Sequence, residues 1–283
     1  DELAALLVRV SGDDSLRGRP MDRVVAPLVA MGARIVALGE GGRAPLAFRG
    51  GCLKGSDHVI SVASAQVKSA ILLAGLRADG PVRVTGPAAT RDHTERMLLS
   101  MGADVAGDGP SARVLPADRL APLDLDVPGD LSSAAFFLVL AACVPGLRIR
   151  LPGVGVNPGR RGVLDVLARM GCRVTETEWR LAGAEPVAAL EAIGGGLLGA
   201  TIDPSEVPSL VDEIPALCVA AALARGRTEV RGAAELRVKE SDRIAAMVDA
   251  LGTLGVPCGA WPDGLWIEGP ARPLPGCRCT TRG

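Results

Sequence analysis

The sequence contains very few aromatic side chains. Among its 283 residues are three Phe, three Trp and no Tyr, although hydrophobic residues as a whole make up 48%. The interior must therefore be filled mostly by aliphatic side chains. A surface that stacks nucleic-acid bases needs aromatic rings, so their scarcity argues against one. The formal net charge of −1 gives no overall attraction to nucleic acid or to an anionic membrane, and neither partner is expected.

Histidine is also scarce, because His58 and His93 are the two in the chain. Zinc sites and Ser-His-Asp triads both depend on histidine, so neither is expected, and no metal site is predicted. The seven cysteines are scattered, and the closest two, Cys277 and Cys279, have no second Cys or His pair to complete a metal set. We expect reduced thiols in a cytoplasmic protein.

Long apolar runs are missing as well. One of the longest, residues 134–144, is far shorter than the roughly 20 residues that a helix needs to cross a bilayer. The first residues, Asp1, Glu2 and Leu3, lack the basic start of a signal peptide. Neither a membrane segment nor an export signal is therefore expected.

What the sequence does contain is a repeat. A helical pattern ending in Met-Gly or Leu-Gly leads into a short strand pattern four times, with the glycine at positions 32, 102, 171 and 255. Glycine just past a helix end is a common stop signal, and β-branched residues after it favour a strand. The period of about 70 residues predicts βαβαββ units, and hence an α/β (α+β) fold.

A second pattern falls between these glycines. An Ala/Leu-rich helix followed by an alternating strand is predicted at residues 66–84, 134–151 and 214–230. Residues 134–144 are apolar on every side, which predicts a buried helix.

The length favours two domains, each large enough for its own core. Pro128 and Gly129 break the chain in the segment 127–130, just before the second Ala/Leu-rich helix. We therefore expect a first domain at residues 1–128 and a second at residues 129–283.

Residues 237–243 are unusually rich in charge. They read RVKESDR, with three basic and two acidic side chains, and directly precede an amphipathic helical pattern. We expect this helix to start near Ser241 as its N-cap. A solvated charge cluster is the simplest interpretation. Alternatively, the free N–H groups of the helix start and the nearby cations form an anion site.

Two segments of the first half combine polar groups with a predicted helix start. Pro20 is suited to the first position of a helix, which would place Arg19 at the positive end of that helix. Ser64 is a suitable N-cap for the helix that follows, and the Gln66 amide would lie in the first turn. A surface arginine and an ordinary cap are the structural alternatives.

Two further segments carry charge before a helix. Thr90 or Asp92 can cap a helix that runs to Met101, with Arg91 beside the cap. Asp212 precedes the strongly apolar helix predicted from residue 214, where it either stabilises the helix dipole or takes a proton from a substrate hydroxyl.

These segments together resemble one family. The KESDR run at residues 239–243 is similar to the Lys-Glu-(Ser/Thr)-Asp-Arg signature of 5-enolpyruvylshikimate-3-phosphate synthases (EPSP synthases), and residues 61–70 and 208–215 resemble two of the family's substrate loops. The resemblance implies a two-domain enolpyruvyl-transferase fold of βαβαββ repeats with buried helices. It covers nearly all of this chain, but the family's N-terminal and C-terminal motifs are not present in it. We therefore expect an incomplete fold, a fragment lacking both ends.

The resemblance also implies substrate contacts. Shikimate-3-phosphate would be bound by Ser64, Ala65, Gln66 and Arg91, together with Asp212 and Lys239. At position 65 many members carry serine, so here only the backbone would serve. Phosphoenolpyruvate would be bound by Arg19, Gln66, Glu240 and Arg243.

Three residues would carry the chemistry by the same resemblance. Asp212 would act as acid/base near the shikimate hydroxyl, Glu240 would transfer a proton at the enolpyruvyl methylene, and Lys239 would supply a cation beside the attacking hydroxyl. Glu235 stands where many members carry asparagine, which removes one polar contact.

The function implied is transfer of the enolpyruvyl group of phosphoenolpyruvate to the 5-hydroxyl of shikimate-3-phosphate, with release of phosphate. This step of the shikimate pathway leads to aromatic amino acids and needs no cofactor. We expect a monomer whose isolated chain is poorly active. The alternatives are the sister enzyme that acts on UDP-N-acetylglucosamine, and an inactive substrate-binding fragment.

Overall fold

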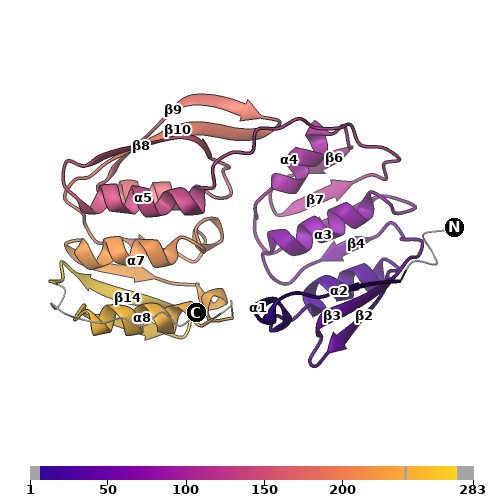
Figure 1. Cartoon of the computed structure of the whole chain (residues 1–283), viewed down its shortest axis with the longest axis horizontal. Helices are drawn as coiled ribbons and strands as arrows, with labels where there is room; N and C mark the ends of the chain where they lie inside the picture. The colour runs from indigo at the N-terminus through magenta and orange to yellow at the C-terminus, as the bar shows by residue number, and fades with distance from the viewer. Residues whose placement is uncertain (1–6, 239–240, 273–283) are drawn as a thin grey trace. The chain divides into compact units, whose positions relative to one another are not determined.

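A computed structural model of the chain describes residues 7–238 and 241–272. The chain divides into two compact units, which we call the N-unit (Asp1–Leu125) and the C-unit (Asp126–Gly283). In Figure 1 the N-unit runs from indigo to magenta and the C-unit from magenta to yellow.

The N-unit contains two sheets and four helices among its described residues. Its three-stranded sheet has the order β1-β3-β2, and its four-stranded sheet has the order β4-β5-β7-β6. The elements in chain order are β1 (Leu7–Val10), α1 (Asp14–Arg17), α2 (Asp22–Ala30), β2 (Arg34–Gly39), β3 (Arg43–Arg49), β4 (Asp57–Val59), α3 (Ala65–Gly75), β5 (Val82–Thr85), α4 (His93–Ser100), β6 (Val105–Gly107) and β7 (Ser111–Val114).

The C-unit also contains two sheets, with the orders β8-β10-β9 and β11-β12-β14-β13. Its elements are α5 (Leu131–Cys143), β8 (Arg148–Gly155), α6 (Gly162–Arg169), β9 (Arg173–Ala182), β10 (Glu185–Ile193), β11 (Thr201–Ile202), η2 (Val207–Ser209), α7 (Ile214–Leu223), β12 (Gly226–Val230), η3 (Ala234–Arg237), α8 (Arg243–Thr253), β13 (Cys258–Trp261) and β14 (Gly264–Gly269).

The elements confirm the predicted βαβαββ repeat. Repeat 2 (β4 to β7) and repeat 4 (β11 to β14) each order their four strands first-second-fourth-third, and the first pair is parallel in both. Repeat 3 (α5 to β10) has the same arrangement, with a parallel bridge between Gly129 and Val154 in place of a full first strand. Repeat 1 (β1 to β3) matches the last three strands. The mixed α/β fold predicted from the sequence is therefore present.

The four glycines that marked the repeat end the second helix of each one. Gly32, Gly102, Gly171 and Gly255 follow α2, α4, α6 and α8 and have φ values of 98°, 81°, 96° and 79°. Glycine adopts this left-handed conformation without the steric cost that a Cβ brings, so the chain can leave the helix and enter the next strand. The interpretation of these positions as helix stops is confirmed.

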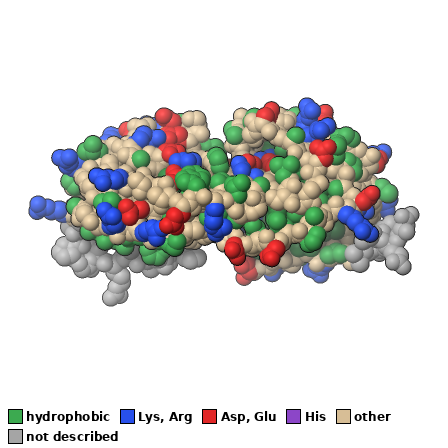
Figure 2. Space-filling model, turned by 90° about the horizontal axis from the view of Figure 1, so that it is seen from above, with side chains coloured by type: hydrophobic (Ala, Val, Ile, Leu, Met, Phe, Trp, Pro, Cys, Tyr) green, Lys and Arg blue, Asp and Glu red, His purple; other side chains and the backbone are tan. Residues whose placement is uncertain are grey.

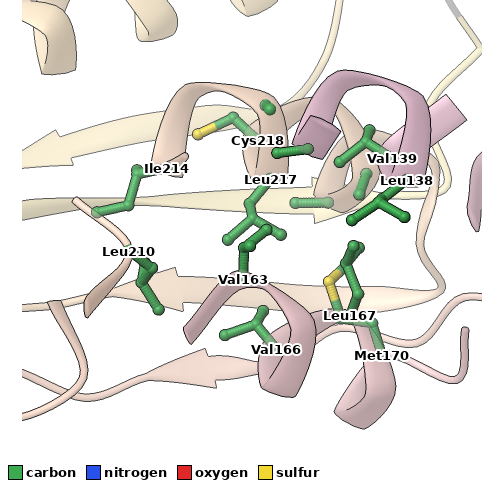
Figure 3. Close-up of a cluster of buried hydrophobic side chains, with 14 of the residues drawn as sticks. Leu138, Val139, Val163, Val166, Leu167, Met170, Leu210, Ile214, Leu217 and Cys218 are labelled. Atoms are coloured by element: carbon green, nitrogen blue, oxygen red, sulfur yellow. The ribbon is translucent and has the colours of Figure 1, made fainter. Parts of the chain in front are cut away.

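Each unit has its own aliphatic core. In the N-unit the fully buried side chains include Ile71 and Leu72 of α3 and Leu98 of α4. The larger core of the C-unit lies between α5, α6 and α7, where Figure 3 shows Leu138, Val163 and Leu217 among the buried side chains. The near-absence of aromatic residues is thus matched by cores of Leu, Ile, Val and Ala.

Helix α5 is less buried than its composition predicted. It packs against α7 and the sheet that contains β8 and β10 (Figure 1), and Leu138 is fully buried there. Its other face exposes Phe136, Phe137 and Leu140, at 67%, 53% and 50% of their surface. An all-apolar sequence hides which face will be covered, because that depends on the neighbours that pack against the helix.

Figure 2 shows both basic and acidic side chains on each unit, with hydrophobic side chains between them, on the face that it presents. This distribution agrees with the formal net charge of −1. Across residues 7–238 and 241–272, no helix is long and apolar enough to cross a membrane.

The buried thiol of Cys218 in α7 is expected to make the C-unit less stable at alkaline pH. Complete burial raises the pKa of its thiol to about 12. The unfolded thiol ionises near pH 9, so the unfolded chain loses its proton first, and rising pH favours unfolding. The protonated thiol therefore contributes its full share to the free energy of unfolding below about pH 9. Between pH 9 and pH 12 this share decreases by about 1.4 kcal/mol per pH unit.

The measurement is urea unfolding at pH 8 and pH 10, followed by the fluorescence of the three tryptophans. All three, Trp179, Trp261 and Trp266, belong to the C-unit. The Cys218→Ala variant is expected to lose less stability over this range than the wild type. Equal losses in the two proteins would contradict the assignment of the effect to Cys218.

Candidate active site

Most of the predicted residues that the structure describes lie at corresponding edges of repeats 2 and 4. In repeat 2, β4 and β5 are parallel neighbours, so the loops that follow them leave the sheet at the same edge. In repeat 4 the same holds for β11 and β12. Ligands of α/β proteins commonly bind where parallel strands end. Two groups of candidates occupy such loops, one in each unit.

In the N-unit, the segment after β4 carries Ser64, Ala65 and Gln66. Ser64 is the N-cap of α3 as predicted, and its Oγ accepts a hydrogen bond from the Val67 backbone N–H at 3.4 Å. Ser64 and Ala65 are half-buried, whereas Gln66 is exposed. The first turn therefore presents an amide side chain, a hydroxyl and the N-terminal end of an 11-residue helix.

Arg91 lies in the loop after β5 and is half-buried. Asp92 occupies the N-cap position of α4, but its carboxylate makes no capping bond and instead accepts from Arg96 Nε at 2.8 Å. Asp92 thus occupies one of the two predicted N-cap positions, but its side chain does not cap the helix. The carboxylate pairs instead with Arg96, which lies one turn later.

Lys68 of α3 is a buried cation that pairs with α4. It is 2% exposed, and its ammonium lies 2.5 Å from Glu95 Oε1 of α4. The neighbouring hydroxyls of Ser69 and Thr94 are 2.7 Å apart. Helical periodicity places Lys68 on a face of α3 but does not show that this face meets another helix.

Arg19 lies between α1 and α2 and is half-buried, with its Nε atom buried. The prediction that Pro20 opens the helix is wrong. Instead, Pro20 pairs with Arg43 in an isolated bridge, and α2 begins at Asp22 after Met21. The restricted φ of proline suits an extended residue as well as a first helical turn.

All four repeats place an arginine at the start of their second helix. Arg19 stands three residues before α2, Arg91 two before α4 and Arg160 two before α6, while Arg243 is the first residue of α8. Three of these four were identified from the sequence. Arg160 was missed, although its equivalent place in the repeat could have indicated it.

In the C-unit, the structure brings together two predicted residues that are 31 positions apart. Arg243 Nη1 lies 3.5 Å from Asp212 Oδ1, and the two side chains are 28% and 29% exposed. The pair joins the segment before α7 to the first turn of α8. It places a carboxylate and a guanidinium together at the edge where β11 and β12 end.

A polar cluster around the buried Glu213, the residue that follows Asp212, was not predicted. Glu213 is 2% exposed and accepts a hydrogen bond from the Ser132 hydroxyl. Arg160 donates to Ser132 Oγ and lies 3.2 Å from Asp130 Oδ1 and 3.7 Å from Glu213 Oε1. These contacts connect the first turn of α5 to the segment that carries Asp212.

Arg237, the first residue of the charged segment, makes three side-chain hydrogen bonds. Its guanidinium donates to the backbone oxygens of Trp261 and Pro262 at 2.6 and 2.8 Å, and to Asp242 Oδ2 at 2.7 Å. Lys239 and Glu240, which were predicted to bind substrate and transfer protons, lie outside the residues that the structure describes.

The cap of α8 is Asp242 rather than Ser241. Asp242 Oδ1 accepts from the Ala245 backbone N–H at 2.9 Å. This backbone hydrogen bond is the largest stabilising cause that lowers the pKa of the Asp242 carboxyl, and the Arg237 guanidinium adds to it against the opposing effect of burial. Both Ser and Asp are good caps, and the added pairing with Arg237 favours Asp242 here.

A hollow in the N-unit borders Ser64. It has a volume of about 280 Å³, and its lining includes Arg23, His58 and Ser61. His58 Nε2 is 2.8 Å from Ser56 Oγ, and burial lowers the pKa of the His58 imidazole. Within the described residues, no group of three or more His, Cys, Asp or Glu side chains is placed to hold a metal ion.

The two groups have complementary chemistry. The N-unit group offers hydrogen-bond donors and a cation suited to a phosphate. The C-unit group offers a half-buried carboxylate that can exchange a proton, held beside a guanidinium that can neutralise an anion.

Comparisons with known proteins agree with the motifs. A family model described as EPSP synthase (3-phosphoshikimate 1-carboxyvinyltransferase) matches residues 2–281. The 3-phosphoshikimate 1-carboxyvinyltransferase of Desulforudis audaxviator is 52% identical over 97% of this chain and 64% of its own length. That of Gloeobacter violaceus is 54% identical over 93% of this chain and 61% of its own length. The chain thus spans about three fifths of these relatives.

Solved structures agree as well. EPSP synthase from Acinetobacter baumannii is 46% identical with a TM-score of 0.83, over 95% of this chain and 62% of that one. The enolpyruvyl transferase NikO from Streptomyces tendae, 18% identical over 94% of this chain and 61% of that one with a TM-score of 0.67, shares the fold. The family match over residues 2–281 and the identities above 50% lead to one conclusion: this chain belongs to the EPSP synthase family.

Proposed function

We propose that this chain carries part of the machinery of a 3-phosphoshikimate 1-carboxyvinyltransferase. The reaction moves the enolpyruvyl group of phosphoenolpyruvate to the 5-hydroxyl of shikimate-3-phosphate and releases phosphate. Two relatives that bear this name are 52% and 54% identical to the chain. Because the chain spans about three fifths of their length, the activity, both substrates and a monomeric state are proposals.

The N-unit residues have the role of binding shikimate-3-phosphate. Ser64 and Gln66 lie at the first turn of α3, and Arg91 follows the neighbouring parallel strand. Backbone N–H groups at a helix start, a hydroxyl and a guanidinium are suited to a phosphate dianion. Ala65 contributes its backbone alone. Arg19, at the equivalent place in repeat 1, is assigned to phosphoenolpyruvate.

The C-unit residues have the role of transferring protons. Protonation of the phosphoenolpyruvate methylene, assigned to Glu240, makes the adjacent carbon electrophilic. The 5-hydroxyl attacks that carbon and gives up its proton to Asp212, with Lys239 beside it. The tetrahedral adduct then loses a methyl proton and the phosphate, which restores the double bond in the product. Arg243 neutralises the phosphate or carboxylate of phosphoenolpyruvate.

The observation that supports this assignment most directly is the contact between Asp212 and Arg243. Each belongs to a separate motif that resembles the family, and the two were predicted to work on the same reaction. Their pairing also places a positive charge beside the Asp212 carboxylate.

A UDP-N-acetylglucosamine enolpyruvyl transferase is the less supported alternative. The family match and the relatives named above favour the shikimate acceptor. A phosphate-release assay with each acceptor in turn distinguishes the two activities. A substrate-binding chain without turnover would bind shikimate-3-phosphate but release phosphate with neither acceptor.

Replacement of Arg91 is expected to weaken shikimate-3-phosphate binding at least about tenfold. A charge-assisted hydrogen bond contributes about 1.5–3 kcal/mol, and about 1.4 kcal/mol corresponds to a factor of ten. The measurement is titration calorimetry of the 283-residue chain and of Arg91→Ala, with weak binding expected for the wild type.

The matched control is Arg83→Ala, which removes an exposed arginine from β5 of the same unit. It is expected to leave the affinity unchanged. If Arg83→Ala and Arg91→Ala weakened binding equally, the loss would reflect the overall charge of the N-unit, and the assignment of Arg91 would be wrong.

A further inference from the structure

Helices α3 and α4 of the N-unit are joined by a buried ion pair. Lys68 Nζ and Glu95 Oε1 are 2.5 Å apart, and their side chains are 3% and 10% exposed. Beside the pair, the hydroxyls of Ser69 and Thr94 are within hydrogen-bond distance at 2.7 Å. The two contacts together link the beginning of α3 to the beginning of α4.

Stability does not readily explain this pair. Taking an ammonium and a carboxylate out of water costs several kcal/mol each, and apolar side chains of similar size often stabilise a core equally well. Ile71 and Leu98, three residues beyond Lys68 and Glu95 on the same helices, already belong to the apolar core. Lys68 also stands near the positive end of α3, where a cation is disfavoured.

An ion pair differs from an apolar contact in the cost of separating its two partners. Apolar side chains tolerate small sliding of one helix along another, whereas a buried ammonium and carboxylate each lose their compensating charge when they move apart. The pair is therefore suited to fixing the position of α4 along α3.

The residues that this contact would position are the proposed binding residues. Gln66 lies two residues before Lys68 and Ser64 four before it, while Arg91 lies four residues before Glu95. Both segments leave the sheet at the edge where the parallel strands β4 and β5 end. A shift of α4 relative to α3 would move the Arg91 guanidinium relative to the Ser64 hydroxyl and the first turn of α3.

We propose that Lys68 and Glu95 are positioning residues, which hold Arg91 and the Ser64–Gln66 segment at the spacing that a phosphorylated substrate requires. This inference rests on the proposed function, because shikimate-3-phosphate is the ligand assigned to those residues. Neither side chain touches the substrate in this role.

The test replaces the pair with apolar side chains of similar length, in the double variant Lys68→Met/Glu95→Met. We expect the dissociation constant for shikimate-3-phosphate to rise about tenfold, within the range of coupling between contacting side chains. Amide hydrogen exchange in α3 and α4 is expected to stay as protected as in the wild type, which a purely structural role would not allow. Exchange is the suitable measure, since all three tryptophans lie in the C-unit.

Two further variants make the result specific. The exchanged pair Lys68→Glu/Glu95→Lys keeps an ion pair between the helices and is expected to recover part of the lost affinity. The control Arg169→Met/Glu206→Met removes a 2.6 Å ion pair from the C-unit and is expected to leave the affinity unchanged.

The outcomes separate the two proposals. Absence of shikimate-3-phosphate binding by the wild-type chain would overturn both. Wild-type binding together with an unchanged dissociation constant in the Met variant would overturn the positioning role alone. Loss of hydrogen-exchange protection in the Met variant, in step with its loss of affinity, would show that the pair is structural and would also overturn that role.

Discussion

Under the proposed function, Asp212→Asn is expected to lower the rate of shikimate-3-phosphate-dependent phosphate release by about 100-fold or more. Asparagine keeps the size of the side chain and can still bond to Arg243, which lies 3.5 Å from Asp212 Oδ1. It cannot accept the proton of the attacking hydroxyl. Loss of a general acid or base typically costs about 10²–10⁴ in rate. The rate is measured at saturating concentrations of both substrates, on the protein expressed from its complete reading frame.

Asp165→Asn is the matched control. Asp165 is an exposed carboxylate in the first turn of α6 in the same unit, and its amide variant is expected to keep the wild-type rate. A rate for Asp212→Asn within a factor of a few of the wild type would show that another group accepts the proton. The acid/base assignment of Asp212 would then fail, while the family membership of the chain would stand.

The largest effect on stability is expected from Leu138→Ala. Leu138 is fully buried in the C-unit core, where α5 meets α6 and α7 (Figure 3). Leu→Ala substitutions in such cores cost about 2–5 kcal/mol, because the removed methyl groups leave a cavity that the surroundings fill only in part. That is a large fraction of the roughly 5–15 kcal/mol that holds a typical domain folded. Urea unfolding followed by tryptophan fluorescence reports on the C-unit, since it holds all three tryptophans.

Leu140→Ala makes the same chemical change two residues further along α5. Leu140 is 50% exposed, so its replacement is expected to cost less than about 1 kcal/mol. Equal losses for the two variants would mean that burial along α5 does not follow the described packing, and that the exposed face of the helix is covered in solution.

The repeat could be predicted from the sequence because its landmarks are local. A glycine just past a helix end meets a requirement of the backbone at that one position, and Gly32, Gly102, Gly171 and Gly255 all adopt positive φ. Alternating and helical hydrophobic patterns depend on residues within one element, so α3, α5 and α7 and the strands after them were identified close to their actual bounds.

The candidate site was predicted only in part. Each of the motifs around Ser64, Arg91, Asp212 and Arg243 is an unbroken segment of the sequence, so each could be compared with a family pattern. The caps were less certain, because neighbouring residues compete. Asp242 caps α8 in place of the adjacent Ser241, since the Arg237 guanidinium also binds its carboxylate.

By itself, then, the sequence determined the α/β repeat, the helix stops, the aliphatic character of the cores and the family resemblance, because each depends on the identity or spacing of nearby residues. Only the tertiary structure decided that Lys68 meets Glu95, that Asp212 meets Arg243 and that Glu213 is buried against Ser132. These partners are 27, 31 and 81 residues apart. Their contacts depend on which strands lie parallel and which helices pack together. The hydrophobic periodicity of a single segment does not show which other segment it will contact.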